Sequence, residues 1–167
     1  MALFSDIDEQ AIFLSRTNCH EPLSSFSHYP FELDNVMWPS VEHYFQAMKF
    51  TNQQHQNNIR EAKSPELARS RGRSRLKKMR PDWGTKKRAY MTRASYIKCR
   101  TYPQIANQLM VSNPKKIIEN NQYDYFWGCG RDRRGLNVFG EILMDIRQKL
   151  LSINQYTLDN DPKAVER

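Results

Sequence analysis

The stretch from Trp38 to Phe50, WPSVEHYFQAMKF, most constrains how this chain folds. Ser40 is a good N-cap, so we expect a helix that begins there and runs to about the end of the stretch. Glu42 and Lys49 are seven residues apart, close to two helical turns, which places both on one face. Phe45 and a glutamine lie between them. Such a face is a poor hydrophobic seam, and we expect it to form the wall of a polar cavity.

The charge balance points to an anionic partner. The 167 residues include 26 Lys and Arg against 18 Asp and Glu, a net charge of +8. This excess favours a phosphorylated metabolite, a nucleotide or a nucleic acid, without choosing among them. Aromatic residues make up 11% of the chain, which argues against disorder, and the length suits one domain with a sizeable core.

The cysteines and the hydropathy pattern bear on location and cofactors. Cys19, Cys99 and Cys129 are far apart and form no CxxC pair, which predicts free thiols in a reducing compartment. No Cys and His cluster has zinc spacing, so we expect no metal site, and nothing in the sequence calls for a cofactor. Because the chain shows neither a leader pattern nor a long apolar run, we predict a soluble cytoplasmic protein without a membrane partner.

The chain shows no internal repeat and no linker between domains. We therefore predict one domain over residues 11–151, preceded by a loose arm at 1–10 and followed by a polar tail at 152–167. Strands are expected at 11–14 and 116–119, with extended structure and a turn at Asp34–Asn35 over 26–36. The expected helices span 40–50, 64–72, 85–100, 103–109 and 139–151. A structured loop covers 124–140. The fold class is thus α+β: a compact, mainly helical domain with a small β-sheet.

The two central charged residues each have a plain and a functional interpretation. Glu42 lies in the first helical turn, where an acid simply meets the positive end of the helix dipole. The same N–H groups would hold it ionised, as a base or a counter-charge. Lys49 is typical of a surface lysine, but Met48 and Phe50 on either side would desolvate it, lower its pKa and yield a nucleophilic amine. His43 points away from Glu42 and is expected to be structural.

The segment Arg69–Arg80 has seven basic residues in twelve. Such a run is often a solvated surface. Here no acid is interleaved to form compensating pairs, so contact with the phosphate of a nucleotide or of a DNA or RNA backbone is an equal alternative. No recognition module accompanies the run, which argues against sequence-specific readout.

The glycine-rich loop and two tryptophans offer further binding groups. Trp83 and Trp127 are either core anchors or platforms on which a base stacks. Gly128 begins a Gly-Cys-Gly pattern that lets the backbone approach a ligand, although it is not a dinucleotide-binding fingerprint. Asp124 and Asn137 flank the loop, where they would hold ribose hydroxyls.

These segments, taken in order, resemble the NADAR family, also called YbiA-like, over roughly residues 11–151. The motifs that carry the resemblance are Leu23-Ser-Ser-Phe26, Pro30-Phe31, the stretch Trp38–Phe50, Ser64-Pro65 with Gly72-Arg73, Arg80-Pro-Asp-Trp83, Asp124-Tyr-Phe-Trp-Gly-Cys-Gly130, Gly135-Leu-Asn137 and Gly140-Glu-Ile-Leu-Met-Asp-Ile-Arg147. The chain departs from the family pattern at Ser25, Met48 and Gly84, and its last loop is unusually basic, with Arg131, Arg133 and Arg134.

The resemblance implies a mainly helical α+β domain that hydrolyses N-glycosidic bonds. One branch of the family cleaves phosphoribosylated intermediates of riboflavin synthesis, and another removes ADP-ribose from modified guanine, including guanine in nucleic acid. The residues that the resemblance marks as active-site candidates are Glu42, Lys49, Trp83, Asp124, Trp127 and Asn137. For Lys49 it implies an amine that opens the ribose through a Schiff base.

We therefore expect an N-glycosidase in which Glu42 stabilises the positive charge that develops on the sugar. Lys49 attacks C1′ or binds phosphate, Asp124 grips the ribose or supplies a proton, and Arg73 and Phe45 help bind the substrate. ADP-ribosylated guanine is the preferred substrate, because the basic run exceeds what one phosphate needs. One alternative is a riboflavin intermediate. A second is a non-catalytic module that binds ADP-ribose or nucleic acid, although a binder has no need of an amine and a carboxylate on one face.

Overall fold

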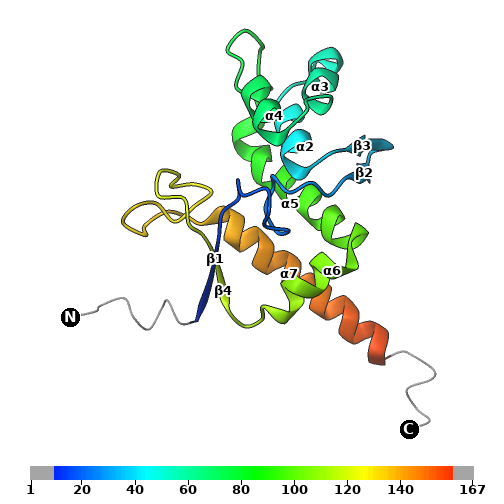
Figure 1. Cartoon of the computed structure of the whole chain (residues 1–167), viewed down its shortest axis with the longest axis vertical. Helices are drawn as coiled ribbons and strands as arrows, with labels where there is room; N and C mark the ends of the chain where they lie inside the picture. Colours follow the sequence, from blue (N-terminus) through cyan, green and yellow to red (C-terminus); the bar gives the residue numbers. More distant parts are fainter. Residues whose placement is uncertain (1–9, 160–167) are drawn as a thin grey trace.

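The computed structural model describes residues 10–159. Within this range the chain forms an α+β domain dominated by helices, as the sequence predicted (Figure 1). The elements are β1 (Ala11–Leu14), β2 (Phe31–Leu33), β3 (Val36–Trp38), α2 (Val41–Ala47), α3 (Gln53–Arg60), α4 (Pro65–Gly72), α5 (Trp83–Thr101), α6 (Pro103–Val111), β4 (Lys116–Glu119) and α7 (Val138–Asp159).

The first and last strands pair in parallel and bring distant parts of the chain together. β1 lies beside β4, with Ala11 opposite Lys116 and Leu14 opposite Glu119 (Figure 1). The carboxyl ends of both strands therefore meet, so the residues after Leu14 lie close to the loop that follows β4. Both strands were predicted, but they form one of two separate two-stranded sheets rather than part of a single sheet.

The second sheet is the hairpin β2–β3, in which Phe31 pairs with Trp38. Its two-residue turn consists of Asp34 and Asn35, with φ angles of 57° and 59°. Asp and Asn tolerate this left-handed backbone better than other side chains, and two such residues in a row match the right-handed twist of the strands. The turn is where the sequence predicted it.

The helix starts follow the capping pattern of the sequence. Ser40 accepts a hydrogen bond from the backbone N–H of the third residue of α2, and Ser64 does the same for α4. α2 is shorter than expected, because it ends at Ala47 and the chain then turns so that Phe50 is buried. Lys49 consequently lies after the helix, and the argument from two full helical turns was wrong in this detail.

Two helices differ from the sequence prediction. α3 was not foreseen, because its sequence, QQHQNNIR, has almost no apolar pattern; Asn52 caps it, and only His55 and Ile59, one turn apart, are buried. α7 continues to Asp159, past the expected end at residue 151, so the first part of the expected tail is helical. Residues 1–9 of the expected arm and 160–167 of the tail lie outside the described residues.

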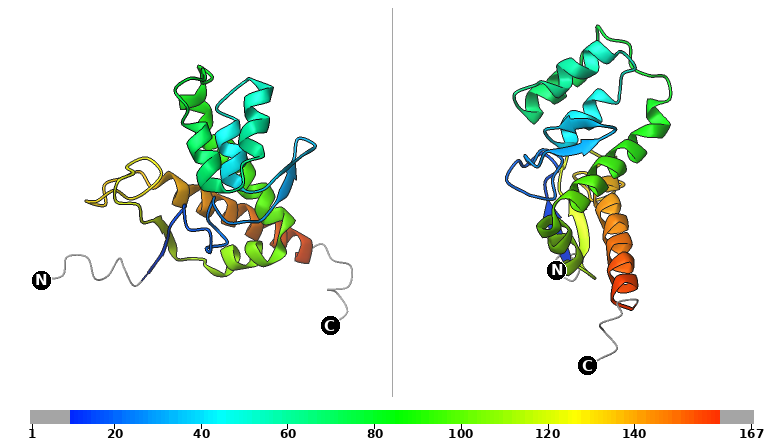
Figure 2. Two further views of the ribbon diagram at one scale, coloured as in Figure 1. Left: turned by 45° about the horizontal axis from the view of Figure 1, so that its top comes forward. Right: turned by 90° about the vertical axis from the view of Figure 1, so that its right-hand side faces the viewer.

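The core forms around α2, which is buried along its whole length. α3, α4 and α5 pack around it, and α5 also packs against α7 (Figure 2). The loop from 120 to 137 connects β4 to α7, and two of its residues, Asp124 and Trp127, line a cavity together with residues of α2 and α4. No helix within residues 10–159 is long and apolar enough to cross a bilayer.

Candidate active site

A small cavity of about 140 Å³ lies where α2, α4 and the loop after β4 meet. Four of its lining residues carry positive charge and one carries negative charge. The lining consists of Arg16, Phe45, Gln46, Lys49, Arg69, Arg73, Asp124 and Trp127. Five of these, Phe45, Lys49, Arg73, Asp124 and Trp127, are site residues expected from the sequence, drawn from segments far apart in the chain.

Lys49 is half-buried at the wall of this cavity. Its Nζ donates one hydrogen bond, 3.3 Å long, to the carbonyl oxygen of Gly72. Loss of water lowers the pKa of this amine to about 8, because burial penalises the charged form. Glu42 opposes the shift, whereas the guanidinium groups of Arg73, Arg69 and Arg16 add to it. A substantial fraction of the amine is therefore neutral near physiological pH, as a nucleophile requires.

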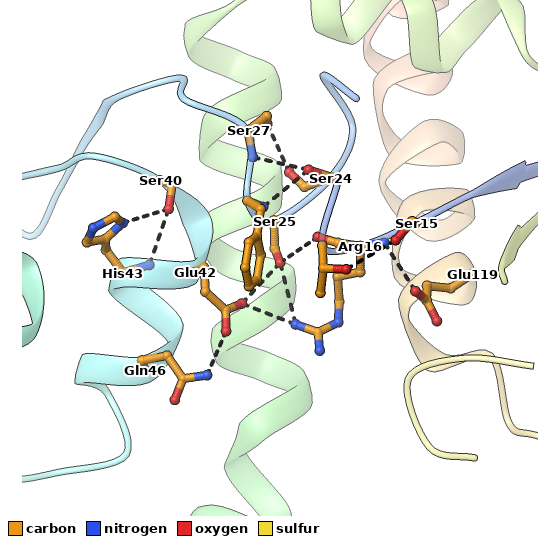
Figure 3. A network of polar contacts seen from close by, with 12 residues as sticks. Ser15, Arg16, Ser24, Ser25, Ser27, Ser40, Glu42, His43, Gln46 and Glu119 are labelled. Atoms are coloured by element: carbon orange, nitrogen blue, oxygen red, sulfur yellow. Dashed lines mark hydrogen bonds and ion pairs between the residues drawn. The ribbon is translucent and has the colours of Figure 1, made fainter. Parts of the chain in front are cut away.

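Glu42 does not line the cavity, contrary to the expectation from its helical spacing. Its side chain is fully buried, and its carboxylate lies between Arg16 and Gln46, both of which line the cavity (Figure 3). Oε2 accepts hydrogen bonds of 3.1 Å from Arg16 Nη1 and from Ser25 Oγ. Oε1 accepts one of 2.6 Å from Gln46 Nε2. Glu42 thus lies one layer behind the wall and fixes two groups that do face the cavity.

Arg16 was missed by the sequence analysis. It follows β1, its backbone N–H donates to Glu119 Oε1 at 3.1 Å, and its carbonyl accepts from the N–H of Ser25 (Figure 3). Its guanidinium carbon lies 5.6 Å from the centre of the Trp127 ring. The position depends on the pairing of β1 with β4, across more than a hundred residues. The available signal was an arginine just after a buried apolar strand.

Some residues of the basic run 69–80 lie where they could contact a phosphate, and others are solvated or have structural partners. Arg69 and Arg73 line the cavity. Arg71 donates to the carbonyl of Asn58, and Arg80 is bound to Asp82, so both have structural partners. The remaining members, Arg75, Lys77 and Lys78, are exposed.

A second hollow adjoins the cavity. It has a volume of about 350 Å³ and is lined by Phe26, Glu66, Arg69, Ser70 and Arg73. Arg69 and Arg73 belong to both linings. The two arginines therefore stand at the boundary between an inner cavity and an outer hollow.

Asp124 is held in place by its own loop. Its Oδ1 accepts hydrogen bonds from the backbone N–H groups of Phe126 and Trp127, at 3.0 and 2.7 Å. Within residues 10–159 no group donates to its Oδ2. Trp127 packs edge-on against Phe45, with ring centres 5.4 Å apart. The loop thus presents a carboxylate and an indole on the side of the cavity opposite α4.

Two expected site residues have local structural roles instead. The ring of Trp83 stacks on Tyr90 and packs against Phe45 within the core, and it does not line the cavity. The Asn137 side chain bonds the backbone of β4: its Nδ2 donates to the Ile117 carbonyl at 2.8 Å, and its Oδ1 accepts from the Glu119 N–H at 2.8 Å. Asn137 therefore fixes the start of α7 against β4.

Gly128 and His43 both have structural roles. A Cβ atom at Gly128 would lie 2.2 Å from Glu119 Oε2, so this glycine serves close packing of the loop rather than approach to a ligand. His43 contacts Ser40 Oγ at 2.7 Å and the Ala62 carbonyl at 3.1 Å through its two ring nitrogens. Its expected structural role is consistent with these contacts. Within the described residues, no His, Cys, Asp and Glu side chains cluster as a metal site would require.

Comparison with known proteins identifies the family. The NADAR domain model matches residues 4–151. The chain is 33% identical to N-glycosidase YbiA of Escherichia coli (strain K12) over 138 residues, covering 83% of this chain and 86% of that protein. It is 41% identical over 128 residues to the riboflavin biosynthesis protein PYRR, chloroplastic, of Zea mays, covering 71% of this chain but only 20% of the maize protein.

A solved structure agrees with this match. The NMR structure of E. coli YbiA superimposes with a TM-score of 0.78 at 32% identity, covering 88% of each chain. Fold, sequence and family model thus coincide over nearly the whole chain. The protein belongs to the NADAR family and is an N-glycosyl hydrolase.

Proposed function

We propose that this N-glycosyl hydrolase removes ADP-ribose from ADP-ribosylated guanine, in a nucleoside or in nucleic acid. The supporting observation is the pair of adjoining hollows that share Arg69 and Arg73. A ribose in the inner cavity would lie beside Lys49, its diphosphate would lie between the two arginines, and the second nucleoside would enter the outer hollow. Arginine suits this role because its planar fork matches phosphate oxygens.

The chemistry follows from Lys49 and Asp124. The neutral Nζ attacks C1′ of the ribose while the bond from C1′ to the guanine nitrogen breaks, and the guanine takes up a proton. Loss of a proton from Nζ with opening of the ring gives an imine, which water hydrolyses to free amine and sugar. Asp124 supplies the proton to the leaving guanine or holds ribose hydroxyls. Trp127 lines the same wall, where it would contact the substrate.

A second candidate substrate is a phosphoribosylated intermediate of riboflavin synthesis. The name of the maize relative favours it. The inner cavity alone, at about 140 Å³, suits a single sugar phosphate and needs no outer hollow. In this case Arg69 and Arg73 would together bind one phosphate.

Three substrates incubated with the purified protein separate the candidates. ADP-ribosylated guanosine, ADP-ribosylated single-stranded DNA and the phosphoribosylated riboflavin precursor are each followed by mass spectrometry of the products. We expect free ADP-ribose from the first two, together with guanosine from the nucleoside and unmodified DNA from the oligonucleotide. Release of ribose 5-phosphate from the precursor, with both ADP-ribosylated substrates intact, would reverse the choice.

The exposed Arg75, Lys77 and Lys78 would add contacts to a nucleic-acid backbone. The DNA substrate should therefore be cleaved faster than the nucleoside at low salt, and the advantage should shrink as salt is raised. Equal rates for both at every salt concentration would remove nucleic acid from the proposal and leave the nucleoside.

A further inference from the structure

Arg16 has a buried guanidinium group, and within residues 10–159 only one of its three nitrogens makes a hydrogen bond. Its exposed fraction is 4%. Nη1 donates to Glu42 Oε2 at 3.1 Å and lies 3.5 Å from Ser25 Oγ. Within residues 10–159, Nε and Nη2 make no hydrogen bond, and neither is among the fully enclosed unpaired side-chain atoms. Both nitrogens therefore keep some accessible surface, and because Arg16 lines the cavity we infer that their N–H groups are available to a ligand there.

The surroundings hold this guanidinium rigidly. The Arg16 backbone is fixed by Glu119 on its N–H and by Ser25 on its carbonyl. The side chain lies over Trp127 and ends at the buried Glu42. A group already held in one orientation loses little freedom when it binds a ligand, which is how preorganised sites gain affinity.

The charges at the cavity leave room for an anion. Four cations line it, whereas the wall offers only the carboxylate of Asp124 and Glu42 lies behind it. Glu42 is matched by Arg16, so the wall keeps an excess of positive charge. A phosphate group, with about two negative charges and several acceptor oxygens, fits this excess and the free N–H donors of Arg16.

We propose that Arg16 binds the phosphate attached to the substrate's ribose, and that Glu42 acts on the reaction through Arg16 rather than by touching the substrate. The proposal rests on the proposed function only in requiring a ribose that carries a phosphate, which both candidate substrates share. Glu42 is thus a positioning residue, and Arg16 is the residue in contact.

The arrangement also predicts opposite pH effects for the two partners. The charged groups around the Lys49 amine are Glu42 from α2, Arg16 from the segment after β1, Arg69 and Arg73 from α4, and Asp124 from the loop after β4. Glu42 raises the pKa of Lys49 and Arg16 lowers it. Glu42→Gln should therefore move the midpoint of the pH–rate profile to lower pH, and Arg16→Met should move it to higher pH. Simple loss of folding would move neither midpoint in a fixed direction.

The experiment measures binding of ribose 5-phosphate by calorimetry to the full chain. We expect Arg16→Met to weaken binding on the order of tenfold or more, the usual scale for a charge-assisted hydrogen bond, and Arg16→Lys to recover part of it. Arg93→Met is the matched control, because Arg93 pairs with Asp34 at the surface and does not line the cavity. Arg93→Met should bind ribose 5-phosphate like the wild type.

A double variant protects the test against unfolding. Arg16→Met alone leaves Glu42 buried without its cation, which destabilises a fold strongly. Arg16→Met/Glu42→Gln removes both charges and should fold. If Glu42 acts only through Arg16, this double variant binds ribose 5-phosphate no more weakly than Arg16→Met does. Its turnover should likewise be close to that of Arg16→Met, because the substitution at Glu42 has little further effect once Arg16 is absent.

The outcomes are distinct. Wild-type affinity for ribose 5-phosphate in both the single and the double variant would overturn the role of Arg16. A loss of turnover from Glu42→Gln that is equally large with and without Arg16 would show that Glu42 acts directly. Because the probe is a simple sugar phosphate, weaker binding by the Arg16 variants would stand even if none of the three substrates were cleaved, in which case the proposed function alone fails.

Discussion

Two lysines of this protein share a pKa lowered to about 8 by burial, yet they differ in almost everything else. Lys98, in the last turn of α5, is 2% exposed. Its Nζ donates to the Pro22 and Ser24 carbonyls at 2.7 Å each and to Ser27 Oγ at 3.1 Å. Lys49 is half-buried, lines a cavity and, among the described residues, makes a single hydrogen bond of 3.3 Å.

The contrast between Lys49 and Lys98 shows that a perturbed pKa does not by itself mark an active site. Both amines lose hydration, which disfavours their charged form. All three N–H donors of Lys98 bind the loop at residues 22–27 and hold it against α5. The amine is buried, so no ligand can reach it. The Lys49 amine lines a cavity and has N–H donors left to bind a ligand. Access and an unmatched charge environment, rather than the pKa shift, separate a reactive lysine from a structural one.

The largest expected effect is on turnover. Lys49→Met should lower kcat on the order of a hundredfold or more, since it removes the proposed nucleophile. Lys98→Met should leave the kcat of the folded protein close to that of the wild type. Initial rates at saturating substrate measure both. A comparable loss of kcat in both variants would contradict the distinction between a reactive Lys49 and a structural Lys98.

Stability should show the reverse order. Lys98→Met removes the amine that donates to two carbonyls and to Ser27 Oγ. The single proton of the Ser27 hydroxyl can then serve only one of the two carbonyls, so the other loses its donor. We expect the free energy of unfolding to fall by about 2–4 kcal/mol. Lys49→Met removes one long hydrogen bond and relieves a desolvated charge, so a change of less than about 1 kcal/mol is expected. Urea unfolding gives both values. A larger loss for Lys49→Met would assign it a structural role.

The pH dependence of turnover sharpens the role of Lys49. Attack requires the neutral amine, whose fraction rises about tenfold per pH unit below the pKa and levels off above it. With the pKa at about 8, kcat should rise from pH 6 to about 8 and then flatten. Product formation at constant ionic strength provides the profile. A rate that is flat or falling over this range would exclude a lysine nucleophile.

The smallest expected effect concerns one acceptor of Lys98. Ser27→Ala removes the hydroxyl and leaves the two carbonyl partners of the lysine in place. We expect a loss of about 1 kcal/mol in unfolding free energy and no change in kcat. A fall in kcat without a fall in the free energy of unfolding would contradict this expectation and show that the loop at residues 22–27 affects the active site.

Local signals allowed much of the fold to be predicted. Ser40 and Ser64 cap the helices they were expected to cap, and Asp34–Asn35 makes the predicted turn. These features depend on residues that are neighbours in sequence. α3 escaped prediction because its polar sequence is held helical by only two buried residues and by its neighbours α2 and α4.

Candidate site residues that belong to a distinctive sequence motif could be predicted. Those that depend on contacts between distant parts of the chain could not. Lys49, Asp124 and Trp127 meet at the cavity as expected. Arg16 reaches it only because β1 pairs with β4, and Glu42 is enclosed only because Arg16 and Ser25 cover it. The local sequence marks Arg16 only as an arginine that follows a buried apolar strand, and it does not show that Arg16 and Ser25 contact Glu42.

The nucleophilic role of Lys49 is tested most directly by borohydride reduction during turnover, followed by peptide mass spectrometry. A reduced ribose adduct should form on Lys49 in the wild type and in Lys98→Met, and no adduct should form in Lys49→Met. Full turnover by protein that carries no adduct on Lys49 would contradict the covalent step and the importance given to this amine.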